Sequence, residues 1–286
     1  MFAESKNIGV LLTHADCHTF PNMINGIDEV LSPKNHRLVL SQTQNKADVE
    51  RSRLLSLLSA NVDGLIVEAV KSVSSNPNLE IYEEFAARNI PVVFANVFYS
   101  EFNCNYIVND DVQGGRVAAQ YLIDQGHKKI GGFFKHDSMQ AFLRHEGFVK
   151  KLIEHSLRPN ESCVIWYSYE NLDDLFSNDQ LPLLRRALSR CSAVLCYNDR
   201  VASKLITAAS AIGINIPNDL SVVSFDNSLL CRLTTPTITS VTHPGEEMGK
   251  LAAESILQII NNPNHKIRYT FQPELVIRSS VRCMSS

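Results

Sequence analysis

Two apolar runs of the sequence end on side chains that could bind a polar ligand. Asp226 follows residues 220–225, and His243 follows residues 238–242 and precedes Pro244. A carboxylate at the end of a buried strand needs a hydrogen-bonding or charged partner. An ionised carboxylate can accept two hydroxyl hydrogens at once. The spacing therefore predicts a binding site that includes Asp226.

Side chains of similar chemistry follow other apolar runs of the chain. Arg144 lies in an otherwise apolar helical segment, on the turn expected to face the strand ends. Carboxylates accept hydroxyl hydrogens, whereas Arg, Lys and Asn donate in fixed directions, and an aromatic ring covers the C–H face of a sugar. The set predicts a small polyol or monosaccharide as ligand. The candidate ligand-binding residues are Phe20, Glu68, Lys135, Asp137, Gln140, Arg144, Tyr169, Asn198, Asp226 and His243.

Several of these positions have a structural interpretation as well. Asp111 and Asp199 are favoured as helix-start residues over ligand contacts, because a carboxylate complements the helix dipole. Phe20 could equally cap the core, and Glu68 could be a solvated loop residue. His243 alone is a weak indication of a binding site, since a lone histidine is more often structural. These alternatives stay open at the level of sequence.

The elements that position these residues alternate along the chain. Apolar runs of strand length are followed by segments with helical spacing, for example residues 193–198 and then residues 199–213. Repeated strand–helix units indicate a parallel sheet with helices on both faces, and ligands bind at the carboxyl ends of its strands. The sequence predicts an α/β fold with two similar open parallel-sheet subdomains, each of roughly 120 residues.

Composition excludes several classes of protein. The 286 residues are 44% hydrophobic and 20% charged, with a net charge of -3 and no run of five or more Lys or Arg. General electrostatic binding of nucleic acid is therefore not expected. No apolar stretch reaches the roughly 18 residues of a membrane span, and the N-terminus has no signal-peptide pattern. The seven cysteines are scattered without a C-x-x-C pair, which favours reduced thiols in a cytoplasmic protein.

Catalytic and cofactor motifs are missing from the sequence. G-x-S-x-G, H-E-x-x-H, G-x-G-x-x-G and the P-loop do not occur. We therefore expect a binding protein without cofactor or metal, and not an enzyme. Two other classes stay open: a sugar-binding receptor of a transport system, and a glycosidase using paired carboxylates.

The segments that carry these residues resemble a known family. They include "VDGLIVEAVKS", "RHEGFVKKL", "AVLCYNDRVA", "SVVSFDN" and "LTTPTITSVTHP", within a match from about residue 7 to residue 280. Together they are similar to the effector-binding domain of LacI/GalR-type transcriptional regulators, which shares the fold of periplasmic sugar-binding proteins. The resemblance implies that Arg144 and Asp226 hold the ligand, that Phe20 and Asn198 contact it, and that His243 is a ligand contact or a hinge residue.

Within this family the sequence resembles the arabinose-responsive repressors. The shared features are "LIVE" at Glu68 with a nearby Lys71, and the "FK-x-D-x-x-Q" pattern of Lys135, Asp137 and Gln140. The resemblance implies L-arabinose as the effector. A departure is Thr19, where the family often has an aromatic residue.

The resemblance also implies how the domains are organised. Three crossings near His127, His243 and Gln272 would give an N-terminal subdomain of residues 7–127 and 243–271, and a C-terminal subdomain of residues 128–242 and 272–284. The sugar would close these two lobes about the hinge. The family dimerises and binds operator DNA through a separate N-terminal domain, a winged helix in the arabinose repressors. We expect that DNA-binding domain to be absent from this chain, because the first strand begins near Asn7.

Overall fold

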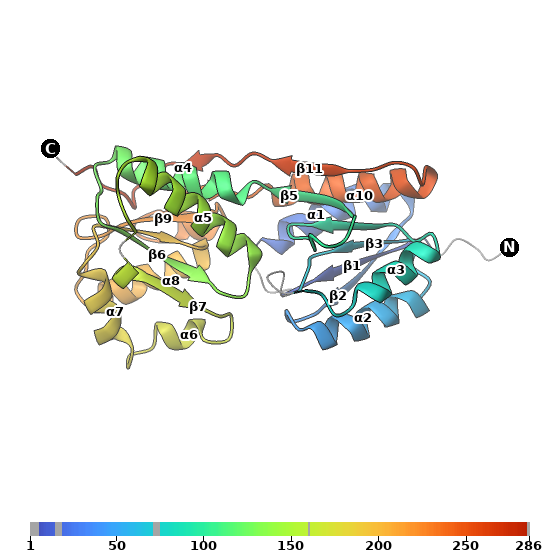
Figure 1. The fold of residues 1–286 in the computed structure, drawn as a ribbon, viewed down its shortest axis with the longest axis horizontal. Helices are drawn as coiled ribbons and strands as arrows, with labels where there is room; N and C mark the ends of the chain where they lie inside the picture. Colours follow the sequence, from blue (N-terminus) through green and yellow to red (C-terminus); the bar gives the residue numbers. More distant parts are fainter. Residues whose placement is uncertain (1–5, 15–18, 71–74, 160, 285–286) are drawn as a thin grey trace. The chain divides into compact units, whose positions relative to one another are not determined.

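The chain forms two units, each with its own sheet. The computed structural model describes residues 6–14, 19–70, 75–159 and 161–284. The first unit contains the chain up to Asn109 together with Pro244–Phe271, and the second contains Asp110–His243 and the chain from Gln272 onward. Both units are therefore discontinuous in sequence (Figure 1).

The first crossing between the units differs from the prediction. The chain crosses after Asn109, not near His127, so residues 110–127 belong to the second unit. The reason is the packing of the helix that begins at Asp111, which lies against the helix that carries Arg144. The other two crossings lie at His243–Pro244 and Phe271–Gln272.

The first unit is built on a parallel sheet of six strands in the order β11-β5-β4-β3-β1-β2. Its core lies between this sheet and its helices, and includes Ile27, Ile66 and Ile256. Its elements are β1 (Asn7–Leu12), α1 (Phe20–Leu31), η1 (Ser32–Lys34), β2 (Arg37–Gln42), α2 (Ala47–Ser59), β3 (Gly64–Val67), α3 (Leu79–Ala87), β4 (Val92–Ala95), β5 (Asn105–Asn109), α10 (Gly245–Asn261) and β11 (Arg268–Phe271).

The second unit repeats this plan with the strand order β12-β10-β9-β8-β6-β7. All its pairings are parallel except that of β10 with β12. Its elements are α4 (Asp111–Asp124), β6 (Ile130–Lys135), α5 (Met139–Glu154), η2 (Glu161–Cys163), β7 (Val164–Tyr167), α6 (Leu172–Leu175), α7 (Leu181–Leu188), β8 (Ala193–Cys196), α8 (Asp199–Ala211), β9 (Ser221–Asp226), α9 (Leu230–Leu233), β10 (Thr239–Thr242) and β12 (Leu275–Val276).

The central strands explain why the α/β prediction is confirmed. All four residues of β3, β4 and β8 are buried, as expected for parallel strands covered by helices on both faces. The equivalent strands of the two sheets are β1 and β6, β3 and β8, and β4 and β9. The described helices include none that is long and apolar enough to cross a membrane.

Glycines let α4 and α5 approach closely in the second unit. A Cβ atom at Gly147 would collide with the carbonyl oxygen of Val112, and one at Gly115 would collide with that of Arg144. A larger residue at either position would push the two helices apart. The close approach brings Arg144 within reach of the first turn of α4.

The first unit uses the same device between α1 and α10. A Cβ atom at Gly26 would meet the carbonyl oxygen of Glu246, and one at Gly249 would meet that of Met23. Helix α10, from the distant segment of the unit, thereby covers α1 and the adjoining sheet (Figure 1). The apolar faces of both helices are buried in this contact.

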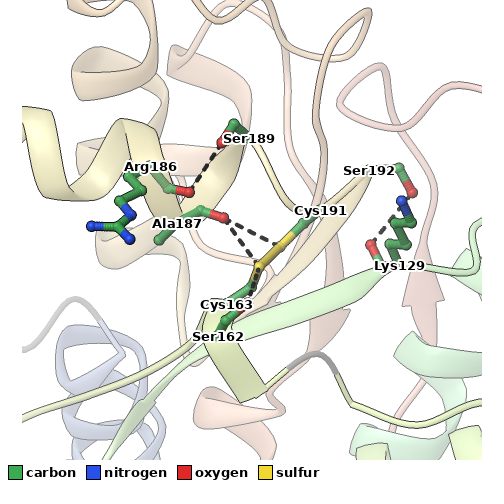
Figure 2. Close-up of a disulfide and its surroundings, with 8 residues drawn as sticks. All are labelled: Lys129, Ser162, Cys163, Arg186, Ala187, Ser189, Cys191 and Ser192. Atoms are coloured by element: carbon green, nitrogen blue, oxygen red, sulfur yellow. Dashed lines mark hydrogen bonds between the residues drawn. A yellow bond between two sulfur atoms is a disulfide. The ribbon is translucent and has the colours of Figure 1, made fainter.

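The prediction of reduced thiols is wrong for two cysteines. Figure 2 shows Cys163, which precedes β7, joined by a disulfide to Cys191, which precedes β8, with 6.7 Å between their Cα atoms. The carbonyl oxygen of Ala187 lies 3.0 Å from Sγ of Cys163 and 3.8 Å from Sγ of Cys191. Adjacent loops at the same end of the sheet bring the pair together, although 28 positions separate the two residues in sequence.

Candidate functional site

Glu68 lies at the carboxyl end of β3 in the first unit, and it is buried, not a solvated loop residue. Its Oε2 accepts from the backbone N–H of Thr13 at 2.9 Å and from the Thr13 hydroxyl. Its Oε1 accepts from Nδ2 of Asn96 at 2.8 Å. Asn96 follows β4 with a left-handed φ of 73°. Three neighbouring strand ends thus converge on one carboxylate.

Phe20 and Lys71 differ in what the structure says about them. Phe20 begins α1 and is buried in the core of the first unit, which favours its structural interpretation. Its contact with a ligand stays a prediction. Lys71, part of the arabinose-type pattern, lies outside the described residues.

A second buried carboxylate of the first unit was not among the candidates. Glu50 of α2 accepts from Nδ2 of Asn78 at 2.8 Å and from the hydroxyls of Tyr82 at 2.8 Å and Tyr99 at 2.9 Å. Burial raises the pKa of Glu50 above its usual range, against the effect of these donors. The Tyr99 hydroxyl also accepts from the backbone N–H of Val70, so the network holds the segment just after β3 and Glu68.

Arg144 is the centre of the polar cluster in the second unit. It is 2% exposed, and its Nε donates to Oδ1 of Asp111 at 2.7 Å. Its NH1 donates to the backbone carbonyl of Tyr197 at 2.7 Å and lies 3.5 Å from Oδ1 of Asp226. The guanidinium is packed between two rings, with its carbon 4.9 Å from the centroid of Tyr197 and 4.4 Å from that of Phe225.

The charges of this cluster stabilise one another. Burial lowers the pKa of Arg144, but the charges of Asp111 and Asp226 outweigh it, so that the pKa lies above its ordinary value. The pKa of Asp111 lies above its ordinary value, because burial raises it by more than the charge of Arg144 lowers it. Arg144 is therefore a permanent cation that attracts carboxylates and can donate to a ligand oxygen.

Asp226 ends strand β9, as the sequence predicts, and its side chain is 7% exposed. Its φ of 98° and the φ of 49° at Asn227 lie in the left-handed region. Residues other than glycine adopt this conformation uncommonly, with Asn and Asp the most frequent, and surrounding contacts must hold it. The direction of the Asp226 side chain therefore depends on the contacts of this turn.

Tyrosine rings link the remaining polar candidates of the second unit. Nζ of Lys135 lies 5.8 Å from the ring centroid of Tyr169 and 5.9 Å from that of Tyr197, within range of cation–π interactions. Lys135 also pairs with Asp137 at 3.4 Å. The Tyr197 hydroxyl lies 3.4 Å from Oε1 of Gln140.

Asn198 and Asp199 have different roles at the start of α8. Asn198 caps the helix, with its side chain accepting from the backbone N–H of Val201 at 3.1 Å. Asp199 begins the helix as predicted and is completely buried. Likewise Asp111 begins α4, while the capping side chain is that of Asp110.

His243 directly follows β10 and is half-buried within the second unit. Its role as a ligand contact or hinge residue stays a prediction. The structure thus brings together Lys135, Asp137, Gln140, Arg144 and Asp226 around Tyr197, with Tyr169 beside Lys135.

Sequence reasoning missed Asp111 and Tyr197 as partners of Arg144. It also missed Arg200, whose NH1 lies 3.4 Å from the hydroxyl of Tyr169. The signal available in the sequence was their position directly after apolar runs or at helix starts, which does not reveal their partners.

Comparisons with known proteins agree with this geometry. Residues 119–281 match the family model described as a periplasmic binding protein-like domain. The chain is 32% identical over 284 residues to the arabinose metabolism transcriptional repressor of Halalkalibacterium halodurans, covering 97% of this chain and 76% of that protein. It is 33% identical over 282 residues to the protein of the same name from Geobacillus stearothermophilus, covering 98% and 78%.

Solved structures share the fold. A LacI family transcriptional regulator from Enterococcus faecium with bound ribose has a TM-score of 0.83 at 23% identity, covering 98% of this chain and 100% of that one. The two sheets and their strand-end polar clusters define a ligand-sensing domain of the periplasmic-binding-protein type. The chain belongs to the LacI/GalR family of transcriptional repressors, and hence to a class of regulators that are not enzymes.

Proposed function

We propose that this chain senses a monosaccharide, and that its effector is L-arabinose. The observation that carries the proposal is the buried pair of Arg144 and Asp226 at the carboxyl end of the second sheet, with 3.5 Å between NH1 and Oδ1. A guanidinium and a carboxylate together supply directed donors and acceptors for neighbouring hydroxyl groups. The rings of Tyr169 and Tyr197 near them are suited to the C–H face of a sugar.

The choice of arabinose is supported by the names of two relatives. Both are arabinose metabolism repressors, and both are matched over nearly the whole of this chain. The pattern of Lys135, Asp137 and Gln140 resembles that subgroup, and the structure places these side chains near Tyr197.

Sensing would work through differential binding to two conformations. In our proposal the sugar contacts Arg144 and Asp226 of the second unit, and its binding favours one of two conformations of the protein. The repressor would act in the cytoplasm as a homodimer that binds operator DNA. The sugar can shift the equilibrium only by its difference in affinity for the two states.

A panel of pentoses and hexoses tests the proposal by thermal unfolding and calorimetry. L-Arabinose should raise the melting temperature, because a ligand bound only by the folded state stabilises it. Asp226→Asn keeps the side-chain volume but removes the charge, and it should weaken binding about 10-fold or more, as loss of a charge-assisted hydrogen bond does. Glu146→Gln, at an exposed position of α5, is the control. No shift with any sugar at millimolar concentration would contradict the proposal.

A further inference from the structure

The turn that ends β9 contains two successive left-handed residues, Asp226 with a φ of 98° and Asn227 with a φ of 49°. Such backbone conformations are unfavourable for residues with a side chain, and they persist only where surrounding contacts hold them. The same turn determines the direction of the Asp226 carboxylate. Whatever holds the turn therefore also positions a proposed ligand contact.

One set of contacts holds the backbone of the turn through Asp199. The N–H of Asn227 donates to Oγ of Ser240 at 3.0 Å, and this hydroxyl in turn donates to Oδ1 of Asp199 at 2.8 Å. The N–H of Ser228 donates to Oδ2 of Asp199 at 2.7 Å. Asp199 and Ser240 are both 0% exposed, so these bonds do not compete with water.

The Ser240 hydroxyl can make both of these hydrogen bonds at the same time. The Ser240 hydroxyl has one hydrogen, which it gives to Asp199, and a lone pair, which accepts from Asn227. Asp199 also accepts from the hydroxyl of Ser224 on β9. The first residue of α8 is thus joined to β9, to β10 and to the turn between them.

A second set of contacts holds the side chain of the turn through Arg278. Its NH2 donates to Oδ1 of Asn227 at 2.6 Å, and its NH1 donates to the carbonyl of Ile238 at 2.7 Å. Its backbone N–H donates to Oγ1 of Thr239 at 2.9 Å. Arg278 lies in the C-terminal segment that returns to the second unit after Phe271.

We propose that Asp199 and Arg278 are positioning residues for effector binding, which hold the turn of Asp226 and Asn227 so that the Asp226 carboxylate stays beside Arg144. They act through the turn: Asp199 fixes its amides and Arg278 fixes the Asn227 side chain. The proposal rests on the proposed function in naming Asp226 as a ligand contact. It gives the C-terminal segment, which contains none of the predicted ligand-binding residues, a part in positioning Asp226.

Hydrogen exchange of backbone amides tests, without any ligand, whether these two sets of contacts hold the turn of Asp226 and Asn227. In the sugar-free protein, hydrogen exchange at the amide of Asn227 should accelerate about 10-fold or more in Ser240→Ala, because the acceptor of this amide is lost. It should also accelerate in Arg278→Ala, because the Asn227 side chain is no longer held. Arg232→Ala is the matched control, since Arg232 is an exposed arginine of the same unit. Exchange at the amides of β6 should not change in any of the three variants.

Affinity for L-arabinose gives the second measurement. Arg278→Ala should weaken binding about 10-fold or more, and Arg278→Lys should restore part of the loss, because lysine keeps the charge. In an Asn227→Gly background the effect of Arg278→Ala should be smaller, since glycine adopts positive φ freely and lacks the amide that Arg278 contacts. A merely structural arginine would weaken binding equally in both backgrounds.

The two proposals fail in distinguishable ways. If wild-type protein binds none of the sugars, the proposed function is wrong, and the exchange rates alone then decide whether Arg278 and the link from Ser240 to Asp199 hold the turn. If wild-type protein binds L-arabinose while Arg278→Ala and Ser240→Ala keep wild-type exchange and affinity, the positioning role is overturned. Ser240→Ala removes only one oxygen atom, and we therefore expect this variant to fold. It can still test the contacts of the turn if Arg278→Ala does not fold.

Discussion

Nε of Arg144 and Oδ1 of Asp111 form a buried ion pair at 2.7 Å, with side-chain exposures of 2% and 3%. The pair joins α5 to the first turn of α4, and the close approach at Gly115 and Gly147 makes it possible. It also orients the guanidinium, because Nε is used by Asp111 while NH1 is directed to Tyr197 and Asp226. Arg144 therefore joins two helices of the second unit, and in our proposal the same side chain binds the ligand.

Asp111→Ala should lower the free energy of unfolding by about 3 kcal/mol, because breaking a buried pair leaves a buried charge poorly compensated. Chemical denaturation of the sugar-free protein measures this change. Glu146→Ala is the control: its pair with Lys150 is roughly half exposed, and its loss should cost less than about 1 kcal/mol. Equal effects of both substitutions would contradict the importance of the buried pair.

Gly147→Ala should destabilise the protein by about 1–3 kcal/mol, since the added Cβ collides with the Val112 carbonyl and forces α5 away from α4. Helix propensity alone predicts the reverse, a gain of about 1 kcal/mol. The denaturation midpoint of Gly147→Ala should therefore fall if the collision dominates, and it should rise if helix propensity dominates. The displacement of α5 should also weaken sugar binding, because Arg144 moves with the helix.

Glu50→Gln should change how stability depends on pH. Because burial raises the pKa of Glu50, the folded state binds a proton more tightly than the unfolded state, whose pKa lies near 4.5. This contribution to stability is present below the unfolded pKa and is lost as pH rises through the folded pKa. The stability of wild type relative to Glu50→Gln should therefore increase as pH falls from 7 towards about 4.5.

The disulfide between Cys163 and Cys191 predicts a specific pattern of alkylation. In denaturant without reductant, peptide mapping by mass spectrometry should find both cysteines unmodified, and reduction should expose them. Reduction should also destabilise the second unit by about 3–4 kcal/mol, from the loop entropy of the reduced chain. Cys283→Ser, at an exposed free thiol, should leave stability unchanged. Full alkylation of Cys163 and Cys191 before reduction would contradict the pairing.

The alternation of short apolar runs with segments of helical spacing was sufficient to predict the fold. Parallel strands are buried on both faces, and they therefore appear in the sequence as continuous apolar runs. The crossing near His127 was implied by the family resemblance, whereas the two units divide after Asn109. The sequence of helix α4 does not say which sheet the helix covers. Its partner is α5, and Asp111 and Arg144 are 33 positions apart in sequence. Local pattern holds no information on such pairs.

Residues of the candidate site could be predicted only where a charged or polar side chain stands at a position that is usually apolar. Asp226 after an apolar strand was such a position, and its place at the end of β9 is confirmed, while its contact with a ligand stays a prediction. The side chain of Asn198 caps α8, which was not predicted from the sequence, and its contact with a ligand stays a prediction. The pairing of Cys163 with Cys191 follows from the order of strands β6, β7 and β8, which no sequence motif encodes.

The discontinuity of both units has a consequence for synthesis on the ribosome. When Asn109 has been made, the first unit still lacks α10 and β11, and the apolar faces of α1 and its sheet are uncovered. At about 5–20 residues per second, roughly 10–30 s pass before Phe271 is added. The N-terminal unit therefore cannot complete its folding first, and the nascent chain must keep an apolar surface from aggregating while the second unit is being made. Chaperones that bind such surfaces would act on residues 7–109 during this interval.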